Sequence, residues 1–170
     1  GPVPVPAPRA LVEALSEVKV EAGSGDTPGG FELGFDLPAH SRRTRECFHT
    51  IRECTKPVVA AVNGAALGAG LAMVASCDLI VVSDKASVGL PEIDVGLMGG
   101  ASHARRLFSH SLLRRMVLTG YRVPGPELYR LGVVEACVPA DELVATAMDF
   151  ARAIASKSPL SVRLAKQTLN

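Results

Sequence analysis

The amino-acid sequence predicts an α/β fold, and three observations lead to that prediction. Two continuous apolar runs of strand-forming residues, PVVAAV at 57–62 and DLIVVSD at 78–84, are typical of strands buried on both faces of a parallel-type sheet. Segments with the apolar spacing of helices lie before, between and after these runs. The chain has 170 residues, of which 48% are hydrophobic, enough for one domain with a full core. We therefore expect a single domain over 1–170 in which strands alternate with helices.

The region before the first strand divides into an arm, a short helix, a loop and a longer helix. Alternate prolines in PVPVPAP remove the backbone donors that a helix or an inner strand needs, so residues 1–8 are predicted to be an extended arm. Residues 9–18 have helical spacing and are followed by a short strand and a glycine-rich loop. The segment 41–56 predicts an amphipathic helix. Its inward residues are expected to be Cys47, Phe48, Ile51 and Cys54.

The region after the first strand alternates between predicted helices and strands. We expect a short helix at 71–77 and a brief extended piece at 86–90, then a helical stretch at 101–120 broken near Ser109 and stopped by Gly120. We also expect a short helix at 124–131, a strand at 133–138, a helix at 139–156 and a last helix from Ser158–Pro159. Residues 157–170 would form the start of a C-terminal helical region.

Composition and charge exclude several classes of function. The formal net charge is +1 and aromatic residues make up 4%, so the chain lacks both the basic face and the stacking surface of a nucleic-acid-binding protein. No apolar run is long enough to cross a bilayer, and the first residues do not resemble a signal peptide. The four cysteines form no CxxC pair and have no histidine at zinc-ligand spacing. We expect reduced thiols, no metal and a soluble, cytoplasmic protein.

The segment Asn63–Gly70 carries three glycines between the first buried strand and a predicted helix. Glycine lets the backbone bend sharply and approach a ligand closely. The first N–H groups of a helix lack partners, and that end of the helix dipole is positive, so an oxygen with negative charge is stabilised there. This pattern predicts an oxyanion-binding turn. A glycine-rich packing turn without a ligand fits the same residues, and no Lys-Ser/Thr follows to make a P-loop.

Two further segments can contribute functional groups to the site of the glycine-rich turn. FELGFDL at 31–37 is a loop whose glycine can place another backbone N–H group. The segment from Gly89 puts the carboxylate of Glu92 where a strand gives way to a loop, and more glycines follow it. A pair of backbone donors and one acid are what an enzyme needs to stabilise an enolate and to move a proton beside it.

These motifs together resemble the crotonase family, the enoyl-CoA hydratases and isomerases. The resemblance is carried by KPVVAAVNGAALGAGLAMVASCDLIVVSDKASVGLPEIDVGL and continues through RRLF, MVLTGYRVPGPELYRLGVVEACVP and SPLSVRLAKQTLN. It covers about 31–170, and although each motif alone is weak, the combination is specific. The resemblance implies a spiral of ββα turns, shortened here at the N-terminus and the C-terminus. It also implies assembly into trimers or hexamers and an acyl-CoA thioester as substrate, with no cofactor besides coenzyme A.

The resemblance also implies roles for individual residues. Matched by motif, FELGFDL makes Phe35 the first backbone donor to the thioester oxygen, and LGAGLAM makes Ala69 the second. Losing one such donor typically costs about 3–4 kcal/mol of transition-state stabilisation. The substrate pocket that the resemblance implies is lined by Gly68, Gly70, Ala72, Pro91 and Gly100.

The sequence departs from the family at one of two acids. Typical hydratases of the family carry two glutamates, and these positions are Ala72 and Glu92 here. Hydration needs an activated water and a proton delivered to carbon, which the paired carboxylates share. Isomerases of the family can shuttle a proton between two carbons with one glutamate. We therefore expect Glu92 to be the catalytic acid–base group of an enzyme that isomerises enoyl-CoA better than it hydrates it.

Two other side chains are candidates to replace the missing acid. Asp94 is two residues from Glu92 and would share its face if that piece is extended, although a loop-capping aspartate fits as well. His103 follows the Gly99–Gly100 pair and could titrate near neutral pH, although a packing or surface histidine fits as well.

Three functions therefore compete. The leading one is an enoyl-CoA hydratase or isomerase that acts through Glu92. The second is another crotonase chemistry, thioester hydrolysis or C–C bond cleavage, with the same pair of backbone donors. The third is a relative that binds acyl-CoA without catalysis, which Ala72 would permit.

Overall fold

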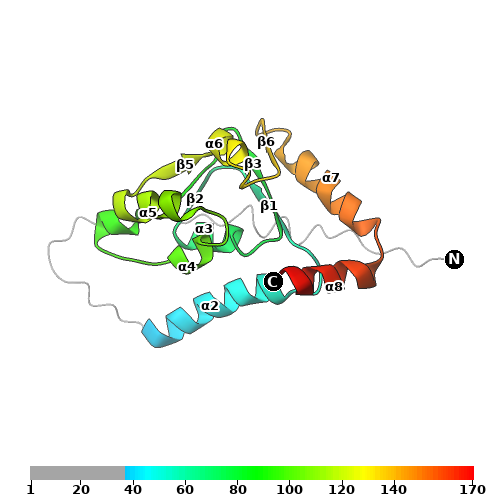
Figure 1. Ribbon diagram of the computed structural model, residues 1–170, viewed down its shortest axis with the longest axis horizontal. Helices are drawn as coiled ribbons and strands as arrows, with labels where there is room; N and C mark the ends of the chain where they lie inside the picture. The colour runs from blue at the N-terminus through cyan, green and yellow to red at the C-terminus, as the bar shows by residue number, and fades with distance from the viewer. Residues whose placement is uncertain (1–36) are drawn as a thin grey trace. The chain divides into compact units, whose positions relative to one another are not determined.

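The computed structural model describes residues 37–170. The predicted proline arm, the helix at 9–18, the strand and loop after it, and Phe35 lie outside the described residues. The predicted alternation of strands and helices is present along the rest of the chain (Figure 1).

A first sheet of three parallel strands forms the centre of the described part. Its order is β1 (Val59–Val62), β3 (Leu79–Ser83) and β6 (Ala136–Val138). The two apolar runs are β1 and β3, as the sequence predicts. β1 contains only Val and Ala, whereas β3 is rich in the strand-favouring residues Val and Ile, and the two strands pair in register from Val59–Leu79 to Val62–Val82.

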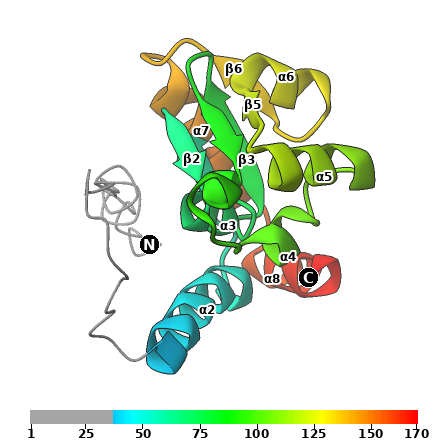
Figure 2. The same ribbon diagram turned by 90° about the vertical axis from the view of Figure 1, so that its left-hand side faces the viewer.

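Both faces of this sheet are covered, because alternate side chains of its strands enter two separate cores. Ile80 and Val82 of β3 belong to the larger core, whereas Val81 between them packs with Leu143 and Ala147 of α7 (Leu143–Ala155). Figures 1 and 2 show α7 on one side of the strands and α5 and α6 on the other. The expectation of strands buried on two faces is therefore confirmed.

A second sheet extends the structure beside the first. Its strands are β2 (Ala65–Leu67), β4 (Ser87–Gly89) and β5 (Arg122–Pro124), with β2 and β4 parallel and β4 and β5 antiparallel. Because β1 pairs with β3 while β2 pairs with β4, two successive strand pairs stack on each other. This stacking of β1–β2 on β3–β4 is one step of a ββ spiral.

The second sheet corrects one prediction about the glycine-rich segment. The sequence predicts a plain turn over Asn63–Gly70, but residues 65–67 form β2, and only then does α3 (Ala69–Val74) begin. The small side chains Ala65 and Ala66 let this strand lie close against β4, a pairing that is not visible in a local sequence pattern. The strand β5 is likewise absent from the predictions, because Arg122–Pro124 is too short to show a period.

The helices agree with the sequence in existence and differ at their ends. The predicted helix at 41–56 is α2 (Leu37–Glu53), whose Phe48 is buried, but Cys47 is exposed and its predicted inward position is wrong. The stretch 101–120 is broken as expected into α4 (Ala101–Ala104) and α5 (His110–Thr119), with Ser109 as the N-cap of α5 and Gly120 as its left-handed C-cap. The other helices are α6 (Gly125–Arg130), α8 (Pro159–Leu169) and the short 3-10 helix η1 (Pro91–Val95).

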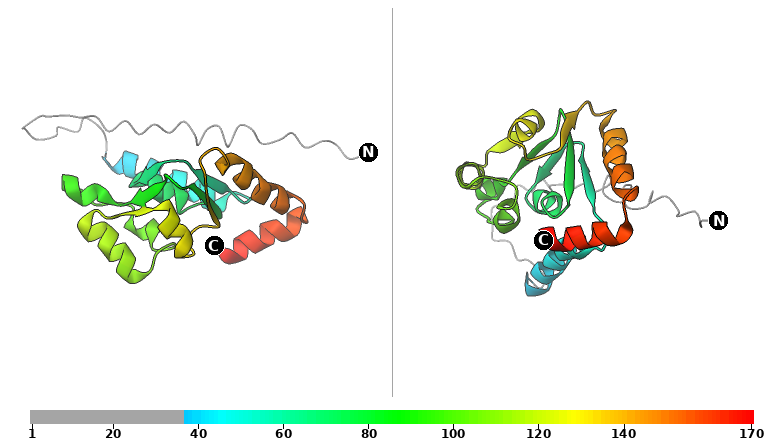
Figure 3. Two further views of the ribbon diagram at one scale, coloured as in Figure 1. Left: turned by 90° about the horizontal axis from the view of Figure 1, so that it is seen from above. Right: turned by 45° about the vertical axis from the view of Figure 1, so that its right-hand side comes forward.

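One buried lysine connects α8 to the end of α2. Lys166 of α8 has a side chain only 4% exposed, and its Nζ donates to the carbonyls of Ile51 and Lys56, at 3.1 Å each, and to Asp78 Oδ2 at 2.8 Å. The same Asp78 oxygen accepts the N–H of Val58 at 2.7 Å. Each hydrogen of the ammonium group therefore has an acceptor, and α8 lies alongside the end of α2, as Figure 3 shows.

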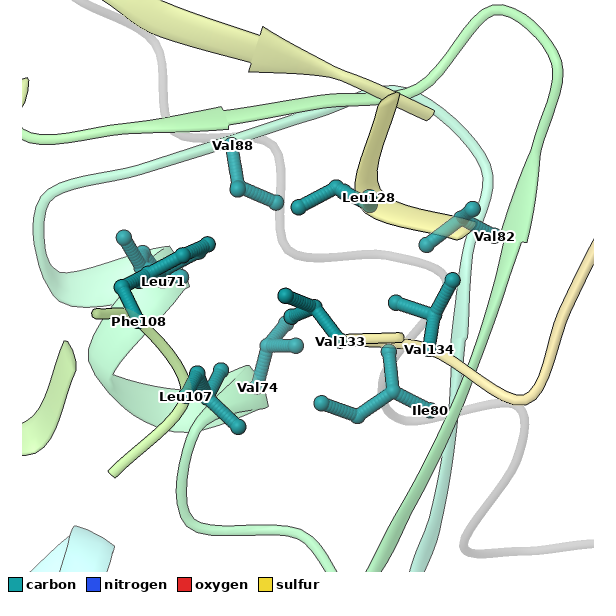
Figure 4. A pocket seen from close by; sticks show the side chains of 10 residues that line it. All are labelled: Leu71, Val74, Ile80, Val82, Val88, Leu107, Phe108, Leu128, Val133 and Val134. Atoms are coloured by element: carbon teal, nitrogen blue, oxygen red, sulfur yellow. The ribbon is translucent and has the colours of Figure 1, made fainter. Parts of the chain in front are cut away.

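The larger core contains a small void rather than a binding cavity. Its volume is about 10 Å³, which is room for about one water molecule, and its walls are entirely apolar. Figure 4 shows the side chains that line it, namely Leu71, Val74, Ile80, Val82, Val88, Leu107, Phe108, Leu128, Val133 and Val134. Such a space is too small for a small-molecule ligand. No helix among residues 37–170 is long and apolar enough to cross a membrane.

Candidate active site

Gly68 is the residue on which the candidate site is built. It follows β2, is the N-cap of α3 and has φ 55° and ψ −116°, a conformation that side chains disfavour. Its N–H donates to the carbonyl of Gly89 at 2.9 Å, which continues the β2–β4 pairing by one residue. The chain can therefore leave the sheet and enter α3 at once, as the glycine pattern predicts.

The carboxylate of Glu92 occupies the space that a side chain at position 68 would take. A Cβ atom built on Gly68 would lie 2.7 Å from Glu92 Oε1 and 3.3 Å from its Cδ. Glu92 reaches this point because β4 ends at Gly89 and η1 begins at Pro91, whose fixed φ suits the first helical position. The structure thus brings together two predicted site residues, Gly68 and Glu92, that are 24 positions apart in the chain.

Glu92 holds one oxygen in an unusual state. Its Oε2 atom is buried and meets no hydrogen-bond donor among the described residues. A buried carboxylate oxygen without a donor is costly, so such atoms are rare where a residue has only a structural role. The lone pairs of this oxygen therefore meet no protein donor in the described part of the chain.

The Gly99–Gly100 pair lies beside the same site, Gly99 near the Glu92 carboxylate and Gly100 near Gly68. A Cβ atom on Gly99 would lie 3.9 Å from Glu92 Oε1, and one on Gly100 would lie 3.4 Å from the carbonyl oxygen of Gly68 and 3.0 Å from Leu90 Cδ2. Gly100 has φ 70° and is the N-cap of α4. Gly100 was predicted as a pocket residue and is next to the site. Gly99 was missed as a site residue, although its place in a glycine pair after an acid is the signal that could have found it.

The remaining predicted residues of the turn differ in what they contact. Ala69 is exposed and is the first residue of α3, so its N–H has no acceptor within the helix. Gly70 lies one residue on, where a Cβ atom would be 3.9 Å from that of Ala66. The position of Gly70 against β2 is a packing contact. Phe35, the other expected donor, lies outside the described residues, so the two predicted donors cannot be placed together.

Ala72 has no accessible surface, and its N–H donates to the carbonyl of Gly68 at 3.0 Å. Ala72 stands where typical hydratases of the family carry a glutamate. Here that position is close in the chain to the glycine turn, but its side chain is apolar and buried. Its own carbonyl accepts the Ser76 hydroxyl at 2.8 Å. At position 72 the chain offers no second carboxylate to Glu92.

Asp94 does not share the surroundings of Glu92. The expectation that both acids lie on one face required an extended segment, but Pro91–Val95 is a 3-10 helix, in which residues two apart point in different directions. The carboxylate of Asp94 lies beside Gly120 at the end of α5, where a Cβ atom would be 2.8 Å from Oδ2. The prediction that Asp94 shares the face of Glu92 is therefore wrong.

His103 contacts helix α2. Its ring meets Phe48 edge-on, with the ring centroids 4.7 Å apart. Burial and the nearby charges of Arg106, Arg52 and His49 lower the pKa of His103. These surroundings are those of a packing histidine, one of the two readings that the sequence left open.

Comparison with known proteins assigns the family. The sequence profile of the enoyl-CoA hydratase/isomerase family matches residues 38–170. The chain belongs to this family. It is 38% identical over 153 residues to a (7aS)-7a-methyl-1,5-dioxo-2,3,5,6,7,7a-hexahydro-1H-indene-carboxyl-CoA hydrolase of Mycobacterium tuberculosis. This alignment covers 83% of this chain and 62% of the relative. It is 36% identical over 126 residues to a short-chain-enoyl-CoA hydratase of Clostridium acetobutylicum, covering 72% of this chain and 48% of the relative.

Solved structures support the fold of this enoyl-CoA hydratase/isomerase family member. A monofunctional enoyl-CoA isomerase from M. smegmatis superposes with a TM-score of 0.68 at 32% identity, covering 74% of this chain and 61% of that one. The predicted crotonase-like fold is thereby confirmed. The chain spans about half to three fifths of the length of the curated relatives that it matches.

Proposed function

We propose that Glu92 is the acid–base group of an acyl-CoA enzyme whose backbone N–H groups stabilise a thioester enolate. The observation that carries this proposal is the buried, unpartnered Oε2 of Glu92 beside the glycine turn of Gly68. A carboxylate held without a donor is free to take a proton, and the exposed start of α3 at Ala69 directly follows Gly68 in the chain. The family supplies the substrate class, because its named relatives act on CoA thioesters.

The reaction that fits one carboxylate best is isomerisation of an enoyl-CoA. Glu92 removes a proton from the carbon next to the carbonyl of a 3-enoyl thioester, and the resulting negative charge moves onto the thioester oxygen. Backbone N–H groups, with Ala69 as the proposed donor in this part of the chain, stabilise that oxygen. Return of the same proton to the far carbon of the dienolate gives the 2-enoyl thioester and restores the carboxylate. Ala72 favours this over hydration, which uses a second acid.

A second candidate reaction is cleavage, either thioester hydrolysis or C–C bond breakage. One observation favours it: the M. tuberculosis relative, named as a carboxyl-CoA hydrolase, matches the chain over 83% of its length. The same enolate-stabilising turn would serve that chemistry. The two candidates differ in whether free coenzyme A or a shortened acid appears.

The test is a substrate panel with the protein and two glutamate variants. Enoyl-CoA thioesters of several chain lengths are followed for double-bond migration, for water addition and for release of free thiol. We expect migration in the wild type and a loss of about 10²–10⁴-fold in Glu92→Gln, with binding nearly unchanged. Glu135→Gln, which alters an exposed acid in the loop before β6, is the matched control. Retention of the full rate by Glu92→Gln would overturn the assignment, and thiol release without migration would favour cleavage.

A further inference from the structure

The segment that directly follows Glu92 carries several exposed apolar side chains. Ile93, Val95, Leu97 and Met98 are all exposed, and 85% of the Met98 surface is accessible. None of the catalytic steps above uses these side chains. Single exposed apolar residues are normal on a protein surface, but a group of them in one place is typical of a binding surface.

A turn brings the end of this segment back to Glu92. Gly96 is the C-cap of η1 and has the left-handed φ of 71°, which ends the 3-10 helix and turns the chain. The N–H of Leu97 then donates to the carbonyl of Glu92 at 2.9 Å. Two residues further on, a Cβ atom built on Gly99 would lie 3.9 Å from Glu92 Oε1. Met98 is therefore held between two residues that both lie against Glu92.

This part of the segment is uncharged. Residues 95–102 read VGLMGGAS, a stretch without an ionisable side chain, and the carboxylate of Asp94 before it lies beside Gly120. An apolar surface binds hydrocarbon through the hydrophobic effect and disfavours charged groups, which would lose water without gaining a partner. Methionine suits such contacts because its unbranched, polarizable side chain adapts to irregular apolar shapes.

The chemistry of Glu92 puts hydrocarbon next to this surface. If Glu92 takes a proton from the carbon beside the thioester carbonyl, that carbon lies within hydrogen-bond reach of the carboxylate. The rest of the acyl chain begins one bond further on, so its first carbons lie among the residues that surround Glu92. Leu97 and Gly99 are two of these residues, and the exposed side chain of Met98 stands between them.

We propose that Met98, with Leu97 beside it, is a specificity-determining residue that selects thioesters with a long, uncharged hydrocarbon chain over short ones. This inference rests on the proposed function, because Glu92 fixes where the acyl chain begins. Each methylene group that Met98 covers leaves water and adds to the affinity. The position of Met98 between two neighbours of Glu92 favours the substrate as the occupant of this surface over a second copy of the chain.

Calorimetric titration of the full chain with octanoyl-CoA and with butanoyl-CoA tests this inference. We expect the wild type to bind octanoyl-CoA about tenfold more tightly or better, and Met98→Ser to reduce this ratio of affinities by about fivefold. Met98→Leu should keep the ratio, because it keeps the apolar surface. Leu160→Ser, which changes another exposed apolar residue at the start of α8, is the matched control and should also keep it. The wild-type ratio in Met98→Ser would overturn the proposal.

Two further measurements separate this inference from its alternatives. The titration uses saturated thioesters and needs no turnover, so a preference for octanoyl-CoA that depends on Met98, in a protein without enoyl-CoA turnover, would contradict the proposed function and support the specificity surface. Turnover without a preference between the two chains would overturn the specificity surface alone. Light scattering gives the mass of each variant in solution. A smaller assembly in Met98→Ser, with both thioesters weakened equally, would assign the surface to a second copy and overturn the proposal.

Discussion

Asp78 and Glu92 are both acids next to strands of the core, but their oxygens have opposite surroundings. Asp78 Oδ2 accepts hydrogen bonds from the nearly inaccessible Lys166 and from the N–H of Val58. Glu92 Oε2 is buried and meets no donor among the described residues. The described part of the chain therefore supplies hydrogen-bond donors to the Asp78 carboxylate but none to Glu92 Oε2. Asp78 holds helices together, whereas Glu92 is the acid that we propose acts on a substrate.

The largest expected difference in stability is between the two variants in which one of these acids is changed to its amide. Asp78→Asn removes the negative charge that pairs with the buried Lys166 ammonium, so the free energy of unfolding should fall by about 3 kcal/mol. Urea unfolding followed by circular dichroism measures this change. Glu92→Gln is the matched variant and should unfold at the wild-type urea concentration or above it, because Oε2 of Glu92 has no hydrogen bond within the described residues to lose. A larger loss of stability in Glu92→Gln than in Asp78→Asn would reverse the comparison.

A smaller effect is expected from filling the space beside Glu92. Gly68→Ala places a Cβ atom 2.7 Å from Glu92 Oε1 and forces alanine into positive φ, so the loss of stability should be about 2 kcal/mol and turnover should also fall. Gly64→Ala is the control, because Gly64 lies in the same segment with nothing within 4 Å of its Cβ position. The two variants are compared by thermal unfolding and by the enoyl-CoA assay. Equal stability of the two would show that Glu92 is not held against this glycine.

The smallest effect concerns pH and His103, which lies outside the Glu92 site. Because its folded pKa is lowered below the unfolded value of about 6.5, stability should be constant above that pH and should fall as the pH drops toward the folded pKa. The effect should be modest because the ring is only partly buried.

His103→Gln should flatten the slope of unfolding free energy against pH below about pH 6.5. Urea unfolding at several pH values supplies the measurement. An unchanged slope in His103→Gln would show that this imidazole gains its proton as easily in the folded state as in the unfolded one.

The sequence predicted the framework of the fold because its signals are local. The apolar runs of β1 and β3, the Ser109 cap and the Gly120 stop each depend on a few neighbouring residues. The short strands β2 and β5 were not predicted, since Ala65–Leu67 and Arg122–Pro124 become strands only through pairing with β4.

The candidate site was predictable to a similar degree. Motif resemblance identified Gly68 and Glu92, and the structure brings them together. The surroundings of Asp94 and His103 were not predictable, because they depend on a 3-10 turn and on a contact with Phe48 of a distant helix. Local patterns indicate which groups are present, and tertiary packing decides which groups meet.

Exchange of substrate carbon-bound protons with solvent tests the central claim most directly. A saturated acyl-CoA thioester is incubated with the protein in deuterated water, and loss of the proton next to the carbonyl is followed by NMR. This exchange needs an enolate and a base but no double bond or water addition, so it is independent of the overall reaction. We predict exchange by the wild type and by Glu135→Gln, and a rate at least about 10²-fold lower in Glu92→Gln. Exchange by Glu92→Gln at the wild-type rate would contradict the assignment of Glu92 as the proton carrier.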